Sequence, residues 1–289
     1  MDFYLSAIVL GLAYCGMGLG IYITLRIFNI PDITTDGSYT LGAAVTASML
    51  SQHLPLPFIV VVTLFSGAIA GFATGMIHTR LKINPLLAGI LVMTALYSVN
   101  LSVMGRSNIP LINTINLQQY FHWFESEQYN WLFVMILFAV SLWLLISWLL
   151  KTDFGLAMRA TGNSETMIRA LGVNTSNMKV LGLMIANALT AFSGLLVCQY
   201  QQFSDINMGI GIVIFGLGAV MMGESLLGFL NIKSIPLRLI GVIFGCVLFR
   251  TIIGLALTLG INPNWLKLVT AVIVLLVVGL PNLKRRNSG

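Results

Sequence analysis

Two short polar segments stand out in an otherwise apolar chain, and their side chains could hold a small polar solute by hydrogen bonds. One runs from Pro31 to Ser38 and the other from Ser204 to Gly211. The candidate contact residues in them are Asp32, Thr35, Asp36, Ser38, Asp205 and Asn207. The same residue types are good helix caps, and glycine beside them permits unusual backbone angles. The sequence leaves both roles open.

A third polar segment, residues 151–179, contains the signals of one short helix from Asn163 to Leu171. The residues that suit its ends are Asn163 and Glu165 at the start and Arg169 and Gly172 at the end. Its apolar face consists of Met167, Ile168 and Leu171. A helix of about eight residues is marginal in water, so this one needs a surface to pack on. That surface is its own bundle, the membrane or another protein.

No catalytic or metal-binding pattern is present in the sequence. Cys15, Cys198 and Cys246 each lie alone in apolar runs, which favours packing over a disulfide or a metal site. The three histidines have no ligand spacing, and neither a nucleophile–base set nor a phosphate-binding glycine loop occurs. We therefore expect no enzyme activity, metal, cofactor or nucleic-acid partner for this chain.

Membrane helices must position these segments. Of the 289 residues 57% are hydrophobic and only 8% are charged, and the mean hydropathy is +0.93. A soluble domain has about 25% charged residues, so this chain could not cover a soluble surface. At about 20 residues per span the length is filled by eight to ten spans. A nucleotide-binding domain of on the order of 100 residues does not fit beside them, so any ATP would have to be handled by another subunit.

The apolar windows predict an all-α, polytopic membrane helix bundle with nine spans. The expected spans are Tyr4–Ile27, Tyr39–Leu50, Phe58–Ile77, Pro85–Met104, Trp131–Leu150, Val180–Val197, Ile210–Met222, Ile235–Leu257 and Trp265–Leu280. The second and seventh are short and follow the polar segments, which indicates discontinuous helices near a solute route.

The basic residues predict an orientation. With the N-terminus outside, 12 of the 15 Lys and Arg fall on the inner face. They are Arg26, Arg80, Lys82, Lys151, Arg159, Arg169, Lys179, Lys233, Arg238, Lys284, Arg285 and Arg286. Cytoplasmic loops are enriched in basic residues, so we expect the N-terminus outside and the C-terminus in the cytoplasm.

An internal repeat matches spans one to four with spans six to nine. The paired motifs are Ile83-Asn84-Pro85 with Ile261-Asn262-Pro263, Asp32-Ile33 with Asp205-Ile206, and Leu41-Gly42-Ala43 with Leu217-Gly218-Ala219. Five spans separate each element from its copy, so the copies cross the membrane in opposite directions. Such inverted repeats are typical of transporters. We expect one transmembrane domain over residues 1–289, with repeats at 1–105 and 180–281 around a cytoplasmic loop at 151–179.

The cytoplasmic loop resembles a known family. The run Gly-Leu-Ala-Met-Arg-Ala-Thr-Gly-Asn at 155–163, Ala-Leu-Gly-Val at 170–173 and Ala-Phe-Ser-Gly at 191–194 are similar to permease subunits of ATP-binding-cassette importers of the branched-chain amino acid and ribose class. Residues 31–38, 41–44 and 84–90 resemble more closely the branch labelled tryptophan or tyrosine type.

This resemblance implies a transport subunit in the bacterial plasma membrane that moves a small polar solute, with an aromatic or branched-chain amino acid favoured. The implied partners are two copies of a cytoplasmic ATPase that holds ATP and Mg²⁺, an external substrate-binding protein and a second permease. We expect the second permease to be another copy of this chain, with a heterodimer left open. The residues that the family's coupling helix would use here are Arg159, Asn163, Glu165, Ile168, Arg169, Leu171 and Gly172.

An ion-coupled secondary transporter is the alternative, because it also uses inverted repeats and broken helices. It would need polar residues at mid-membrane for the coupling ion, and Asp32 and Asp36 are the available acids. The capped inner loop has no role in that scheme, which favours the importer subunit.

Overall fold

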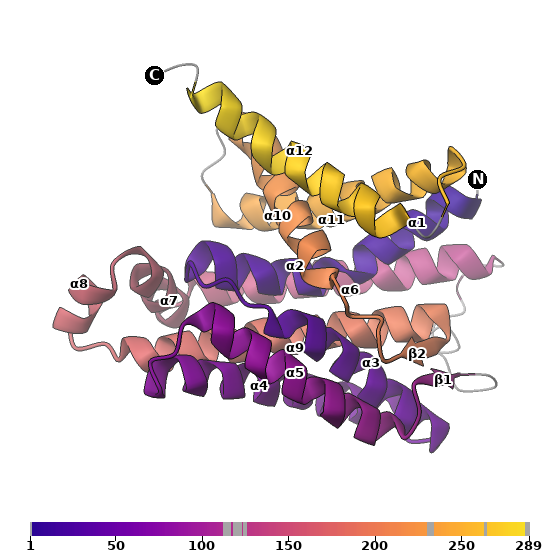
Figure 1. Ribbon diagram of the computed structural model, residues 1–289, viewed down its shortest axis with the longest axis horizontal. Helices are drawn as coiled ribbons and strands as arrows, with labels where there is room; N and C mark the ends of the chain where they lie inside the picture. The colour runs from indigo at the N-terminus through magenta and orange to yellow at the C-terminus, as the bar shows by residue number, and fades with distance from the viewer. Residues whose placement is uncertain are drawn as a thin grey trace.

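The computed structural model describes residues 2–111, 117, 123, 126–229, 234–262 and 265–286 (Figure 1). Helices make up nearly all of it. The elements are α1 (Asp2–Ala13), α2 (Cys15–Ile21), the π-helix η1 (Tyr22–Ile27), α3 (Thr34–Ser51), α4 (Leu56–Arg80), α5 (Pro85–Met104), β1 (Asn108–Pro110), α6 (Glu127–Lys151), α7 (Asp153–Asn163), α8 (Glu165–Ala170), α9 (Thr175–Gln201), β2 (Phe203–Asp205), α10 (Ile212–Phe229), α11 (Ile235–Thr258) and α12 (Leu266–Arg286). The predicted all-α class is confirmed, apart from two short strands.

Five described helices, α4, α5, α6, α9 and α11, are long and apolar enough to cross a membrane. The first span is a bent pair, Phe3–Ala13 and Cys15–Ile27, with an angle of 40° between its parts, and it makes a sixth if counted as one. Shorter apolar helices lie at Ile212–Gly228 and Leu266–Val277. Together these lengths and compositions describe a multi-pass membrane protein.

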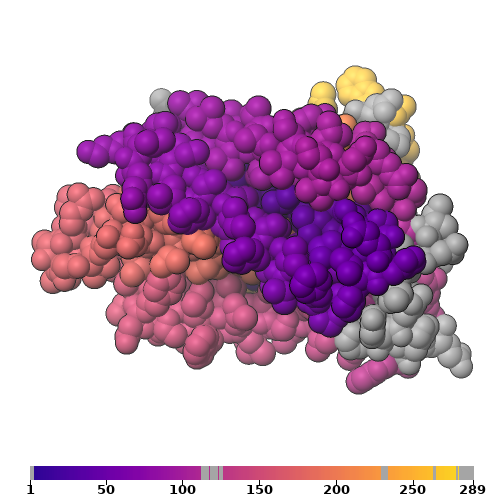
Figure 2. Space-filling model, turned by 90° about the horizontal axis from the view of Figure 1, so that it is seen from below, coloured from indigo at the N-terminus to yellow at the C-terminus, as the bar shows by residue number. Residues whose placement is uncertain are grey.

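Helix α9 is the centre of the bundle. Of its most apolar window 78% is buried, against 28% in each of α4, α5 and α6. It packs most extensively against α4 and α3 and also contacts α2. In Figure 1, α3, α4, α5 and α9 form one group, while α10, α11 and α12 form a second group beyond α1 and α2. Figure 2 views the first group from below, with the start of α9 and α8 projecting at one end (salmon).

Small residues allow α4 and α9 to approach closely. Gly67, Gly71 and Gly75 recur every four residues on one side of α4, and a Cβ atom at any of them would press on α9. At Gly71 that atom would overlap the carbonyl oxygen of Leu183. Close backbone packing of this kind is the usual way in which membrane helices associate, because lipid gives no hydrophobic drive between them.

The two short helices differ in detail from the sequence prediction. Both α3 and α10 have 18 residues and are shorter than the neighbouring spans α4 and α11. Helix α3 begins at Thr34, five residues before the expected Tyr39, because the Asp32 carboxylate accepts the Thr34 N–H at 2.9 Å. Neither helix is interrupted inside its bounds. The described break lies in the first span, between the end of α1 at Ala13 and the start of α2 at Cys15.

The strands β1 and β2 form an antiparallel pair with Asn108 opposite Asp205 and Pro110 opposite Phe203. This pair joins the segment after α5 to the segment after α9 and was not predicted. The Asp205 carboxylate accepts hydrogen bonds from the Asn108 side-chain amide (3.3 Å) and from the Asn207 N–H (2.8 Å). Three-residue strands are too short to leave a period-two pattern in the sequence.

We predict that Gly71→Val lowers the stability of the protein by about 1–3 kcal/mol, because the added side chain cannot fit against α9. The midpoint of thermal unfolding in detergent measures this effect. Gly228→Val is the matched control, since Gly228 lies in α10 with nothing within 4 Å of its would-be Cβ. An equal loss of stability in both variants would contradict the packing role of Gly71.

Candidate functional site

A buried polar cluster joins the start of α3 to the middle of α9. Asp32 is 6% exposed, and one carboxylate oxygen accepts the Asn187 amide N–H at 2.8 Å. The Ser38 hydroxyl donates to the other side of the same amide, the Asn187 Oδ1, at 2.6 Å. Thr35 donates to the Asp32 carbonyl oxygen at 3.2 Å. The Asn187 side chain therefore hydrogen-bonds both to Asp32, just before α3, and to Ser38, in the second turn of α3.

Asp36 connects the two groups of helices. Its carboxylate accepts the Gly211 N–H at 3.0 Å and the Val213 N–H at 2.8 Å, so it caps α10 from outside that helix. A carboxylate at a helix N-terminus satisfies unpaired N–H groups and is favoured by the helix dipole. Gly211 has φ +84°, a left-handed conformation that glycine adopts without strain.

The structure places the six predicted solute-contact residues at the start of α3 and in the segment before α10, and Asp36 joins the two places through its bonds to Gly211 and Val213. Asp32, Thr35 and Ser38 are buried, and their hydrogen bonds go to protein groups. Asp205 and Asn207 lie in the strand and turn before α10. Asn187 was missed by the sequence analysis, and its signal is an amide in the middle of the apolar run of α9.

The loop between α6 and α9 contains two helices where the sequence predicted one. Helix α7 runs over Asp153–Asn163, and the Thr152 hydroxyl caps it by accepting the Gly155 N–H at 3.3 Å. Asn163 was predicted to be the N-cap of the second helix, and this is wrong. Ser164 has that place with extended backbone angles (φ −152°, ψ 94°), and Asn163 is the last residue of α7.

The predicted end of the second helix, α8, is confirmed. Gly172 has φ +85°, its N–H donates to the Arg169 carbonyl at 3.1 Å, and the Val173 N–H donates to the Ile168 carbonyl at 3.3 Å. This pair of bonds is a Schellman motif, which ends a helix at a left-handed residue. The chain turns there toward α9.

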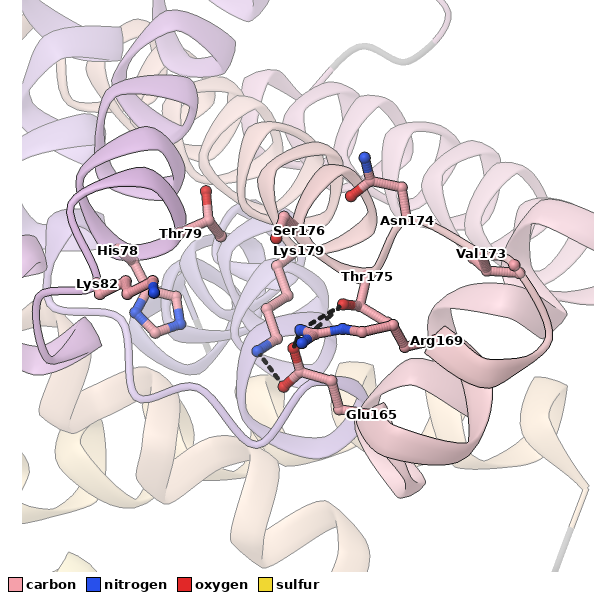
Figure 3. Close-up of a pocket in the computed structure, with 11 residues that line it drawn as sticks. His78, Thr79, Lys82, Glu165, Arg169, Val173, Asn174, Thr175, Ser176 and Lys179 are labelled. Carbon is pink, nitrogen blue, oxygen red and sulfur yellow. Dashed lines mark hydrogen bonds and ion pairs between the residues drawn. The ribbon is translucent and has the colours of Figure 1, made fainter.

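Glu165 ties α8 to the first turns of α9 (Figure 3). Its carboxylate contacts the Lys179 ammonium at 2.6 Å, the Arg169 guanidinium at 2.8 Å and the Thr175 hydroxyl at 3.1 Å. The Lys179 hydrogen bond is the main reason that the pKa of Glu165 lies below its ordinary value. These contacts form one wall of a cavity of about 720 Å³, and His78 at the end of α4 and Lys82 in the turn after it form the other.

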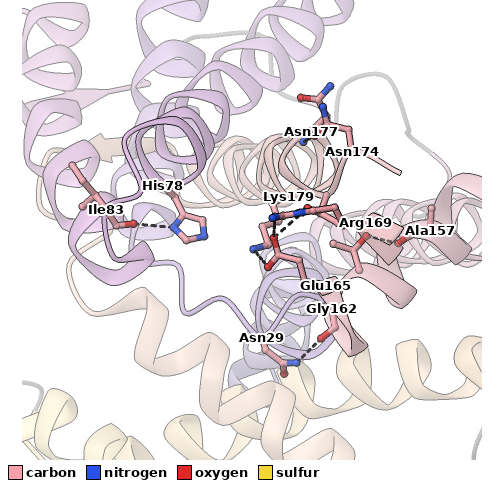
Figure 4. A network of polar contacts seen from close by, with 12 residues as sticks. Asn29, His78, Ile83, Ala157, Gly162, Glu165, Arg169, Asn174, Asn177 and Lys179 are labelled. Carbon is pink, nitrogen blue, oxygen red and sulfur yellow. Dashed lines mark hydrogen bonds and ion pairs between the residues drawn. The ribbon is translucent and has the colours of Figure 1, made fainter. Parts of the chain in front are cut away.

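Other polar contacts hold the neighbourhood of this cavity in place (Figure 4). The His78 ring nitrogen Nδ1 is 2.9 Å from the Ile83 carbonyl oxygen, and the Asn29 amide donates to the Gly162 carbonyl oxygen at 3.2 Å. The first contact fixes the turn after α4, and the second fixes the end of α7 against the segment after η1. The Glu165 cluster therefore sits on a braced surface.

Helix α8 exposes the apolar side chains that were expected to contact another surface. Met167 is 64% exposed and Leu171 is 69% exposed, while Ile168 is half-buried. Of the other predicted coupling residues, Arg159 and Asn163 lie on α7 and line a second cavity, apart from Glu165 and Arg169. Helix α8 is therefore short and held by ion pairs, and its apolar side chains Met167 and Leu171 are not covered by any of the described residues.

We predict that Glu165→Gln lowers the unfolding midpoint at pH 7 and that this difference disappears in acid. The lowered pKa means that the folded protein favours the carboxylate, so its contribution is present above the ordinary Glu pKa of about 4.3 and is lost as pH falls through the lower folded value. The loss at pH 7 is about 1 kcal/mol or less, because solvent screens this half-exposed group.

Thermal unfolding between pH 3 and pH 7 measures this effect. Asp153→Asn is the control, because Asp153 is an exposed acid of the same loop without an ion pair among the described residues. A wild-type advantage that stayed constant down to pH 3 would exclude the Glu165 ion pairs as its source.

Several known proteins resemble this chain. A tyrosine transport system permease protein of Clostridioides difficile is 37% identical over 92% of this chain and 87% of its own length. An uncharacterized protein of Rickettsia prowazekii is 33% identical over 99% of this chain and all of its own length. A galactose/methyl galactoside import permease protein of Haemophilus influenzae is 26% identical over 88% of this chain and 78% of its own length.

A family model described as branched-chain amino acid transport system / permease component matches residues 3–279. The match includes the buried Asp32 cluster, the Asp36 cap and the whole loop of α7 and α8. The predicted resemblance to this family and to its tyrosine-type branch is confirmed, as is the assignment to transport subunits and not to enzymes. The chain belongs to the permease family of the branched-chain amino acid transport systems.

Proposed function

We propose that this chain is the permease subunit of an ATP-binding-cassette importer and that its solute is a small polar molecule, with an aromatic amino acid favoured. The tyrosine permease of C. difficile supports the amino acid, and the more distant galactose permease supports a sugar less strongly. The observation that carries the proposal is α8, a braced helix with exposed apolar side chains.

The partner for α8 is the cytoplasmic ATPase, of which the importer uses two copies. Met167, Ile168 and Leu171 supply the apolar contact, Arg169 supplies charge, and Glu165 and Gly172 hold the shape of the helix. Arg159 and Asn163 lie on α7, the helix before α8, and are further candidates for contact with the ATPase. ATP and Mg²⁺ belong to the ATPase, and an external binding protein delivers the solute.

In this proposal the chain crosses the membrane nine times, with its N-terminus outside and its C-terminus in the cytoplasm. The six spans counted above are joined by α3, α10 and α12. Five spans then precede the basic loop of α7 and α8, and an odd number of crossings from an outside N-terminus puts that loop in the cytoplasm, in agreement with the distribution of basic residues.

We also infer that residues 1–105 and 180–281 are inverted copies. Helix lengths support this pairing: α3 and α10 both have 18 residues, α4 and α11 have 25 and 24, and α5 and α12 have 20 and 21. In both halves a non-helical segment precedes the short helix. Pro263 of the second Ile-Asn-Pro motif lies outside the described residues.

The solute route in this proposal runs between the halves, past Asp36 and the turn that contains Asn207. The hydroxyls of Thr94, Ser98 and Ser102 extend it, because they are exposed on one side of the apolar helix α5. Hydroxyls at this depth are better matched to a water-filled route or a partner subunit than to lipid tails. A second copy of this chain against α5 would enclose them.

We predict that Gly172→Val lowers transport and transport-linked ATP hydrolysis at least about fivefold, the lower range of a coupling free energy. The reason is that a β-branched residue is strained at φ +85° and would shift the end of α8. Uptake and ATP hydrolysis by the reconstituted importer measure the effect, and solute capture by the isolated binding protein is expected to stay unchanged.

The matched control is Gly105→Val. Gly105 has φ +65° at the other end of the bundle, and like Gly172 it has nothing within 4 Å of its would-be Cβ. Both variants carry similar backbone strain, so only a contact with the ATPase distinguishes them. Equal transport by the Gly172 and Gly105 variants would contradict docking through α8.

A further inference from the structure

A second cavity near α7 carries more positive charge than the structure neutralises. It has a volume of about 310 Å³ and is bounded by η1, the end of α7 and the start of α11. Its polar lining residues are Tyr22, Arg26, Asn29, Arg159, Asn163 and Arg238. Three of these are arginines, and each comes from a different helix.

One of the three charges has an acidic partner. Arg26 forms an ion pair with Glu224 of α10, and its guanidinium also contacts the Met221 sulfur at 3.3 Å. Within the described ranges no acidic group pairs with Arg159 or Arg238. Arg159 donates only a long hydrogen bond of 3.4 Å to the Gly155 carbonyl, and Arg238 interacts with the Tyr22 hydroxyl.

The cavity differs in this respect from the one beside α8. There Glu165 binds both Arg169 and Lys179, so the charges of that cluster are largely balanced. In the arginine cavity like charges converge without a shared carboxylate. Like charges that converge in this way repel each other, and an anion bound between them would relieve the repulsion. Arg26 and Arg238 are exposed and Arg159 is half-buried, so an anion from outside the protein can reach them.

We propose that this arginine cavity binds a phosphate group at the cytoplasmic end of the bundle. Guanidinium groups present donors in a planar fork that matches phosphate oxygens. Arg159 and Arg238 have no acidic partner among the described residues, so their donors are available to the charged oxygens of a phosphate group. The amides of Asn29 and Asn163 supply further donors at the rim.

Two sources offer this chemistry. An anionic phospholipid headgroup of the inner leaflet is one, because basic pockets between membrane helices take such headgroups. Soluble phosphate from the cytoplasm is the other. An acidic surface of the ATPase is a different class of partner, and the experiment separates it from both.

The test uses the full-length permease in nanodiscs. In one arm the discs contain equal amounts of phosphatidylglycerol and phosphatidylcholine, and native mass spectrometry counts the phosphatidylglycerol that stays bound. In the other arm the discs contain phosphatidylcholine alone, and calorimetry measures the binding of inorganic phosphate. We expect the double variant Arg159→Gln, Arg238→Gln to lose about tenfold or more of the retained anion in at least one arm.

Two further variants keep the result interpretable. Arg80→Gln with Lys151→Gln removes the same charge from exposed positions outside the cavity and is expected to bind as wild type does. The double variant Arg159→Lys, Arg238→Lys keeps both positive charges but loses the planar guanidinium groups. Weaker anion binding by this variant would support phosphate recognition even if the Gln variant does not fold.

A loss in the first arm assigns the site to lipid, and a loss in the second arm alone assigns it to soluble phosphate. Unchanged binding in both arms would overturn the proposal. So would a Gln variant that keeps lipid and phosphate binding but no longer co-purifies with the ATPase, because the arginines would then recognise an acidic protein surface. Neither result depends on whether α8 docks, so failure here leaves the function proposed above untouched.

Discussion

Two helices of this permease, α3 and α10, start from non-helical segments, and the N–H groups of their first turns need hydrogen-bond partners. In a membrane an unpaired N–H group costs several kcal/mol, because no water reaches it. Asp32 and Asp36 meet this requirement: the first caps α3, and the second reaches from α3 to cap α10. The position of α10 relative to α3 therefore depends on one carboxylate, and the meeting point of the two helix groups depends on both.

Helix α9 links this meeting point to the loop of α7 and α8. Its first turns carry Thr175 and Lys179, which hold Glu165 of α8. Its middle carries Asn187, which holds Asp32 and Ser38. A displacement of α8 by a partner would thus act on α9 first and then on the start of α3. Because α9 packs closely on the glycines of α4, α9 has little room to move sideways relative to α4.

Much of the fold could be predicted because membrane helices follow directly from apolar length and from scarce charges. The end of α8 at Gly172 was predictable because left-handed caps favour glycine. The start of α8 was not, because Asn163 and Ser164 are both good caps and the choice depends on the contacts of α7 with the bundle. The capping of α10 by Asp36 and the hydrogen bond from Asn187 to Asp32 could not be predicted from the sequence, because each joins residues more than 140 positions apart. Sequence spacing carries no signal for such contacts.

Uptake into proteoliposomes is the most direct test of the claim that this chain is driven by an ATPase. The permease would be reconstituted with its ATPase and binding protein, and radiolabelled tyrosine would be followed with ATP or with an ion gradient as the energy source. Our account predicts uptake that requires ATP and all the partners, and none with an ion gradient alone. Uptake by the permease alone in response to a Na⁺ or H⁺ gradient would contradict it and would favour a secondary transporter.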